Sequence, residues 1–420
     1  MLTKQEIVED IISIVHNDYA GYIDKPGQDD YAKLRNIVAN PELTDEAFFF
    51  AVSNYLAAMQ DGHLRIVENG NLPIHTDFLV RRFENSLFVI HTTNTANVEV
   101  GDEIVAIDGL DIATKVKEYK YVQATTDLAR QEWRYILEQA TTITLSTGAV
   151  LPIHKSNKGL QLPDEHYYRE LDAQTGYLKL GDFEAAQPIK GLIDQYGEEI
   201  TSKANLIIDV RVNYGGSDLY YYPLMDYIFP NETTIQQIFA GNDDFDYFNL
   251  TERNVKSRER MFAPFFDQPD LSAEIRDGLN KELAFYRAHR GEGWVERHGD
   301  DEQTVFAVHG QATPQNIVVL SDVYCGSSGD QFVDICKLSP KVTVMGRNTM
   351  GITDYSNVIC DNYDLFTLVY PTSRTSLVAN GHGISGIGVA VDIEIPWTPA
   401  HLQRDVDLDE ALAYLRKLEN

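Results

Sequence analysis

Three features are scarce in this sequence: cysteine, basic residues and long apolar runs. The 420 residues contain only three cysteines, Cys325, Cys336 and Cys360, which excludes a disulfide framework and is typical of a reducing compartment. Lysine and arginine number 35 against 64 aspartate and glutamate residues, a formal net charge of −29. This charge argues against nucleic acid or an anionic membrane as a partner. No apolar run reaches the roughly 20 residues of a membrane-spanning helix.

Two sequence patterns are also missing. The first residues, MLTKQEIVED, do not show the basic and then apolar order of a secretory signal peptide, so we expect a cytoplasmic protein. The 11 histidines and the cysteines show neither His-x-x-x-His nor Cys-x-x-Cys spacing. We therefore expect no metal ion and no cofactor.

The hydrophobic pattern divides the chain into three parts, and 420 residues have room for two or three domains. Residues 1–74 carry apolar residues at helical spacing and predict a small helical bundle that ends in Asp61-Gly62-His63. Residues 75–158 are rich in β-forming runs. Residues 159–420 alternate strands and helices, which predicts an α/β fold, with a segment at about 230–305 that could form a lid.

One stretch of the third part has the order strand, tight turn and helix. Residues 315–320 read as a buried strand, and residues 332–338 have the spacing of one apolar helical face. The turn between them is Gly-Ser-Ser-Gly, in which Ser327 and Asp330 are spaced as in a capping box. A hydroxyl there faces free N–H groups and the positive end of the helix dipole, which suits a nucleophile that becomes an oxyanion. A plain N-cap serine explains the same pattern.

Two other stretches carry candidate residues. A buried strand at 205–211 is followed by a Gly215-Gly216 turn and a helix, which leaves N–H groups free for an anion or simply makes an ordinary turn. His63 lies where a predicted helix stops and a strand begins, and is either a catalytic or a structural histidine.

The second part contains the pattern Gly101-Asp102-x-Ile104-x-x-Ile107-Asp108-Gly109, which resembles the central strands of a PDZ domain. In such domains the Asp-Gly pair closes a hairpin. The Gly-Leu-Gly-Phe-like loop that holds a peptide carboxylate is not found. We therefore predict a PDZ-like domain at 75–158, either peptide-binding or purely structural.

Taken together and in order, the Asp-Gly-His motif, the segment Asp209-x-Arg211-x-Asn213-x-Gly215-Gly216 and the Gly-Ser-Ser-Gly turn resemble one peptidase family. It is the S41-type family of tail-specific C-terminal processing proteases, the tricorn core protease and interphotoreceptor retinoid-binding protein. The resemblance implies a crotonase-like ββα-spiral catalytic domain, often preceded by a PDZ-like domain. It also implies a serine peptidase that hydrolyses peptide bonds of oligopeptides or unfolded polypeptides.

The resemblance implies roles for individual residues. It makes Ser327 the nucleophile, or Ser328 if the alignment shifts by one residue, and His63 the general base. The implied oxyanion donors are the main-chain N–H groups of Gly215 or Gly216 and of Ser328. The lysine of the tail-specific branch falls at Ile352, so the chain is closer to the tricorn-like branch, which uses serine, histidine and glutamate.

The glutamate of that branch falls at Ser385. A serine accepts the imidazole N–H bond but cannot neutralise the imidazolium, so Ser385→Glu is expected to raise the rate. Asp354 or Asp392 could take this place instead. Two alternatives to an active serine peptidase stay open. One is a degenerate relative that binds peptide or a hydrophobic ligand without turnover, and the other is a cysteine hydrolase that uses Cys325 with His63.

Overall fold

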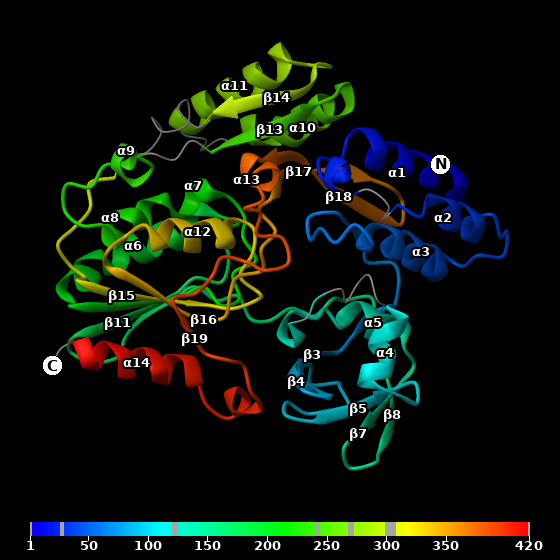
Figure 1. The fold of residues 1–420 in the computed structure, drawn as a ribbon, viewed down its shortest axis with the longest axis horizontal. Coiled ribbons are helices and arrows are strands. Elements are labelled where there is room, and N and C mark those ends of the chain that lie inside the picture. The colour runs from blue at the N-terminus through cyan, green and yellow to red at the C-terminus, as the bar shows by residue number, and fades with distance from the viewer. Residues whose placement is uncertain are drawn as a thin grey trace.

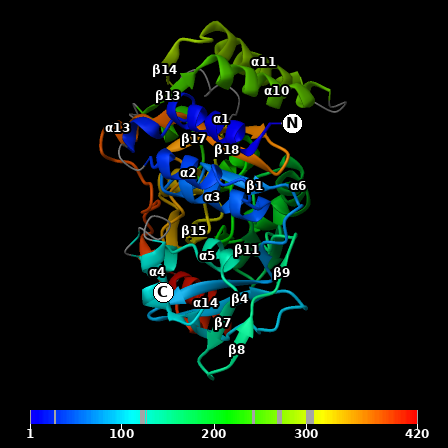
Figure 2. The ribbon, with the colours of Figure 1, turned by 90° about the vertical axis from the view of Figure 1, so that its right-hand side faces the viewer.

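The computed structural model describes residues 2–25, 29–119, 125, 127–240, 244–267, 273–298 and 308–418. Its helices pack on three large β-sheets (Figure 1). Seen from the side, α10 (Glu252–Phe266) and α11 (Ala273–Ala288) lie at one end of the molecule, and the sheet of residues 78–152 lies at the other (Figure 2). None of the described helices has the length and apolar character needed to cross a membrane.

The central sheet carries the Gly-Ser-Ser-Gly turn. Its strand order is β10 (Tyr167–Glu170), β11 (Thr175–Lys179), β12 (Asn205–Asp209), β15 (Asn316–Ser321), β16 (Val342–Gly346) and β19 (Ile393–Glu394). Strands β10 and β11 are antiparallel, and all later neighbours are parallel. Parallel neighbours need crossover connections, which here contain helices. The predicted α/β class is confirmed.

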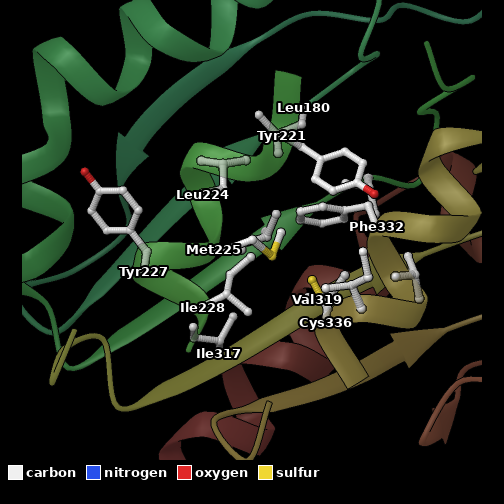
Figure 3. Packing of buried hydrophobic residues seen from close by; sticks show 14 of the residues in the cluster. Leu180, Tyr221, Leu224, Met225, Tyr227, Ile228, Ile317, Val319, Phe332 and Cys336 are labelled. Atoms are coloured by element: carbon white, nitrogen blue, oxygen red, sulfur yellow. The ribbon is translucent and has the colours of Figure 1, made fainter. Parts of the chain in front are cut away.

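Helices cover both faces of the central sheet (Figure 1). One face holds α6 (Ala186–Ser202), α7 (Asp218–Tyr221), α8 (Met225–Ile228) and α12 (Ser328–Lys337), and the other holds α14 (Val406–Leu418). Because side chains alternate along a strand, Leu206 and Ile208 enter the first core and Ile207 enters the second. Figure 3 shows the first core, where Phe332 of α12 and Val319 of β15 are packed.

A second sheet joins the beginning of the chain to its last third. Its order is β1 (Arg65–Glu68), β18 (Phe366–Thr375), β13 (Phe245–Leu250) and β14 (Gly293–His298), and β17 (Tyr355–Asn362) also pairs with β18. Helices α1 (Lys4–Asn17), α2 (Tyr31–Val38) and α3 (Asp45–Ala57) pack on this sheet. Ile11 and Phe48 share one core with Phe366 and Tyr370. The structure therefore differs from a separate bundle at 1–74, because amphipathic helices bury their apolar stripes against the nearest apolar surface.

The third sheet lies within the β-rich part. It contains β3 (Phe78–Phe83), β4 (Ser86–Thr92), β5 (Glu103–Ile107), β7 (Thr142–Leu145) and β8 (Val150–Pro152), with β6 (Leu110–Asp111) paired to β5. The β5–β6 hairpin turns at Asp108-Gly109, as the sequence predicts. Helix α4 (Ile112–Glu118) follows it. Further along, a 3₁₀ turn at Leu128–Arg130 precedes α5 (Arg134–Gln139). A two-stranded ribbon of β2 (His75–Thr76) and β9 (Lys155–Ser156) closes this part.

The segment at about 230–305 is attached to the second sheet. Strand β13 pairs with both β14 and β18, and α10 and α11 follow β13 in the chain. Among the described residues, the short helices not yet named are α9 (Ile235–Ile238), which lies in this segment, α13 (Ser376–Ala379) and 3₁₀ turns at Tyr22–Asp24, Tyr222–Leu224 and Pro399–Leu402. A lid role for this segment stays a prediction.

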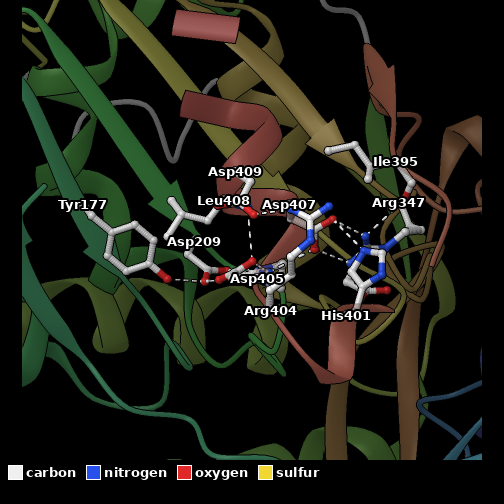
Figure 4. A network of polar contacts seen from close by, with 12 residues as sticks. Tyr177, Asp209, Arg347, Ile395, His401, Arg404, Asp405, Asp407, Leu408 and Asp409 are labelled. Carbon is white, nitrogen blue, oxygen red and sulfur yellow. Dashed lines mark hydrogen bonds and ion pairs between the residues drawn. The ribbon is translucent and has the colours of Figure 1, made fainter. Parts of the chain in front are cut away.

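Buried charges connect the β-rich part to the carboxyl ends of the central strands. Arg81 of β3 donates to both oxygens of Asp322, which follows β15, at 2.8 Å each. Arg347, which follows β16, donates to Asp322 at 2.5 Å and to Asp407 of α14 at 2.5 and 2.8 Å. Figure 4 shows Arg347 and Asp407 in the network that continues to Asp209. Burial alone raises the pKa of Asp322, but the two guanidinium charges outweigh it and hold this pKa far below its ordinary value.

We expect Asp322→Asn to lower the free energy of unfolding by about 3–5 kcal/mol, because two buried guanidinium groups lose their shared partner. Asp322 stabilises the fold fully above the pKa of the unfolded chain, about 3.9, and this contribution is lost as the pH falls toward the folded value. Urea unfolding at neutral pH and near pH 3 tests both points, and the difference from wild type should shrink in acid. The exposed Asp364→Asn is the matched control, with an expected change within about 0.5 kcal/mol. An equal effect of the two substitutions would refute the role of the network.

Candidate active site

Ser327 occupies a strained turn between β15 and α12. Its backbone has φ 57° and ψ −124°, a region that residues with a side chain rarely adopt. Two hydrogen bonds hold the turn: the Ser327 N–H donates to Asp330 at 2.8 Å, and the Gly326 N–H donates to the carbonyl of Asn213 at 2.9 Å. The half-buried Ser327 hydroxyl lies 3.1 Å from Nε2 of His63.

The His63 ring is held in the tautomer that a general base requires. Its Nδ1 lies 2.6 Å from the main-chain carbonyl oxygen of Tyr355. A carbonyl can only accept, so Nδ1 carries the proton, and Nε2 of the neutral ring presents its lone pair to the Ser327 hydroxyl. The two side chains are 264 residues apart in sequence. They meet because β1, which follows His63, and β17, which begins at Tyr355, both pair with β18.

Ser328 is turned away from the histidine. Its hydroxyl donates to the carbonyl of Gly216 at 2.9 Å, which ties the two glycine-containing turns together. The one-residue alignment shift is therefore not favoured, because the imidazole faces Ser327.

The three expected oxyanion donors differ in their availability. The Gly215 N–H already donates to the side-chain oxygen of Asn213 at 2.9 Å, so the structure corrects this prediction. For the N–H groups of Gly216 and Ser328 no acceptor is found among the described residues. Gly215 instead allows a close approach of its main chain to the Ser327 turn. With its φ of 91°, a Cβ at this position would lie 2.6 Å from Cβ of Ser327 and 2.9 Å from the nitrogen of Ser328.

The Ser385 prediction is also corrected. Its hydroxyl donates to Asp354 at 2.6 Å, and the N–H groups of Ile384 and Ser385 donate to the same carboxylate at 2.9 and 2.7 Å. The Ser385 hydroxyl binds the charged carboxylate of Asp354, which has two acceptor oxygens. The hydrogen bond from Nδ1 of His63 goes instead to the neutral main-chain carbonyl of Tyr355. Asp392 is bound elsewhere, to Lys337 at 2.5 Å.

Comparison with known proteins identifies the family. The model of peptidase family S41 matches residues 174–395, just over half of the chain. The chain belongs to peptidase family S41. No curated protein sequence matches it.

Solved structures share the fold of this S41 chain. Mature CPAF complexed with lactacystin aligns with a TM-score of 0.66 and 13% identity, covering 99% of this chain and 98% of that one. A putative peptidase from Parabacteroides merdae ATCC 43184 aligns with a TM-score of 0.50 and 14% identity, covering 99% and 97%. At these identities the likeness establishes a common fold.

A loop of this S41 chain at residues 349–352 is pinned beside Ser327. The fully buried Asp330 accepts the N–H groups of Gly351 at 2.7 Å and Ile352 at 3.0 Å. Burial raises the pKa of Asp330, and these hydrogen bonds oppose the rise. Ile352, at the position of the tail-specific lysine, presents its side chain to Gly62, where a Cβ would lie 2.7 Å from it. An apolar group thus occupies that corner of the site.

Arg130 reaches the same loop from the β-rich part. Its guanidinium donates to the carbonyl of Met350 at 3.1 Å, to that of Ile387 at 2.6 Å, and also to that of Thr349. The sequence shows no pattern that marks this arginine, because its acceptors are main-chain carbonyls more than 200 residues away. The sequence does not predict the role of the Tyr355 carbonyl either, because this acceptor also belongs to the main chain. The Asp-x-Arg-x-Asn segment of the sequence includes Asn213, but it does not predict the contacts of the Asn213 side chain.

The cysteine alternative is not supported. Cys325 is fully buried, and burial raises the pKa of its thiol well above the ordinary value, which disfavours the reactive thiolate. Within the described residues, no three His, Cys, Asp or Glu side chains are arranged to hold a metal ion.

We expect Gly215→Ala to reduce kcat by a factor on the order of 10²–10³. The added methyl group would collide with Cβ of Ser327 and with the nitrogen of Ser328, and displacing this N–H removes one candidate oxyanion donor, for which a loss of this size is typical. Steady-state kinetics with a peptide substrate measure this loss. Gly191→Ala is the control, since a Cβ there meets no atom within 4 Å, and its activity should stay within twofold. Normal kcat in Gly215→Ala would show that this space is not needed.

Contrary to the sequence-based expectation, Ser385→Glu should lower kcat and thermal stability, because it places a second carboxylate against Asp354. Ser385→Ala removes one hydrogen bond to a charged group and should lower the free energy of unfolding by about 1.5–3 kcal/mol. Melting temperatures and kcat/KM of both variants provide the test. A rate gain with glutamate would mean that a side chain at 385 reaches the histidine after all.

Proposed function

We propose that this chain is a serine peptidase in which Ser327 is the nucleophile and His63 the general base, acting on oligopeptides or unfolded polypeptides. The observation that carries the proposal is the 3.1 Å approach of Ser327 Oγ to a histidine whose other nitrogen is committed to the Tyr355 carbonyl. Membership of peptidase family S41 supports the same reaction class.

The proposed reaction has two halves. In the first, His63 takes the proton of Ser327 as Oγ attacks the peptide carbonyl carbon, and returns it to the leaving amine. The tetrahedral oxyanion accepts hydrogen bonds from the N–H groups of Gly216 and Ser328. In the second half, water enters the place of the amine and attacks the acyl carbon while His63 takes its proton. The bond between this carbon and Ser327 Oγ then breaks, His63 returns the proton to Oγ, and the carboxylic acid is released.

We also propose a crotonase-like catalytic unit at 159–420 and a PDZ-like unit at 75–158. The central sheet with its crossover helices supports the first, and the β5–β6 hairpin at Asp108-Gly109 supports the second. In this arrangement Arg130 of the PDZ-like unit steadies the loop beside the nucleophile. The strongly acidic composition supports peptides, and not nucleic acid or anionic membranes, as partners.

The decisive experiment is labelling with a fluorophosphonate probe, followed by mapping of the modified residue. Ser327→Ala should abolish labelling, and Ser327→Ala and His63→Ala should each lower peptide hydrolysis by a factor on the order of 10⁴ or more. Melting temperatures should change little, and chelators should have no effect. Ser328→Ala is the matched control and should still be labelled. Full activity of Ser327→Ala would refute the proposal, and a folded wild type that binds peptide without labelling would favour a binding protein.

A further inference from the structure

Among the residues that the structure describes, no charged group is hydrogen-bonded to Nδ1 of His63. Nδ1 of His63 donates to the neutral carbonyl of Tyr355, and the neutral Ser385 is bonded to Asp354. During catalysis the ring becomes an imidazolium, which an adjacent negative charge normally stabilises. The inference below rests on the proposed function and concerns the origin of that charge.

The carboxylate nearest in sequence is Asp61, in the same Asp-Gly-His motif. Its Oδ1 accepts the main-chain N–H of His63 at 2.9 Å, and its Oδ2 accepts the hydroxyl of Tyr19 at 2.8 Å. The side chain is buried, so water screens its charge only weakly. Both oxygens are therefore held in place, and one of them is bonded directly to the main chain of His63.

We propose that Asp61 is a positioning residue that supplies the negative charge for the His63 imidazolium. It acts through space and through the His63 main chain, and it replaces the carboxylate that would bind Nδ1 in a conventional triad.

The charges of Asp61 and His63 affect each other. Burial raises the pKa of Asp61, and the charges of His63 and Lys25, with the two hydrogen bonds, oppose the rise. The Asp61 carboxylate is hydrogen-bonded to the main chain of the residue whose ring becomes positive during catalysis, and a buried charge at such short range favours the opposite charge. Burial and the nearby Asp61 raise the pKa of Tyr19 well above its ordinary value, so this hydroxyl remains a donor at working pH.

Other charged groups face the same corner. Lys25 donates to the carbonyl of Gln60 at 3.1 Å, and its Nζ lies 5.1 Å from the ring centre of Tyr355. Burial lowers the pKa of Lys25. The remaining groups are Asp24, paired with Arg374 at 2.7 Å, Asp354, bonded to Ser385 at 2.6 Å, and Arg65, bonded to the Gly62 carbonyl at 2.8 Å. Among these carboxylates, Asp61 is the one with a recorded hydrogen bond to His63.

The test is Asp61→Asn, which keeps an oxygen for the His63 N–H and removes the charge. We expect kcat to fall about tenfold, KM to stay within twofold, and the acid limb of the kcat/KM profile to move to lower pH by roughly one unit. Asp24→Asn is the matched control, because it removes a charge that Arg374 already balances, and its profile should be unchanged. A structural role alone would lower kcat without moving the profile.

A second variant keeps the inference testable if Asp61→Asn does not fold. Lys25→Met removes the cation that competes with His63 for Asp61, so the acid limb should move to higher pH. The inference is overturned by an unmoved profile in Asp61→Asn, or in Lys25→Met if only that variant folds. It is also overturned if Asp24→Asn moves the profile as much as Asp61→Asn. Failure of the proposed function is seen separately, as a Ser327→Ala variant that remains active.

Discussion

The antiparallel pairing of β1 with β18 is the interaction on which the site depends. It places His63, at the start of β1, beside Tyr355 at the start of β17, although they are 292 residues apart. Closing so long a loop costs conformational entropy. The cost is offset by the core that α1, α2 and α3 form with β17 and β18. The N-terminal helices thus support the proposed site, because they pack on the sheet that contains β1, the strand that follows His63.

Much of the proposed chemistry is assigned to the main chain. The Tyr355 carbonyl selects the tautomer of His63, and the N–H groups of Gly216 and Ser328 are the proposed oxyanion donors. A carbonyl or an amide is present whatever the side chain, which explains how the site tolerates serine at 385. The consequence is electrostatic: a neutral acceptor orients the ring but leaves its positive charge to be balanced by a carboxylate elsewhere.

Buried carboxylates act as anchors for the loops around the nucleophile. Asp330 holds the turn of Ser327 and the loop at 351–352, Asp354 holds residues 384–385, and Asp322 joins Arg81 to Arg347. Each carboxylate accepts several hydrogen bonds in a region that excludes water, where such bonds are strong and an unpaired group is costly. The strong negative charge of the chain is therefore in part structural.

Local periodicity and turn chemistry are enough to predict the α/β class, the strand–turn–helix geometry around Ser327 and the helix-to-strand junction at His63. That a side chain at 215 or 216 would collide with neighbouring segments is seen only in the folded structure. Three features follow from the folding of distant segments onto one another. The Gly215 N–H donates to Asn213, Ser385 binds Asp354, and the N-terminal helices share a core with β18. These outcomes depend on contacts between segments hundreds of residues apart, and on main-chain partners that carry no residue identity for a sequence pattern to reveal.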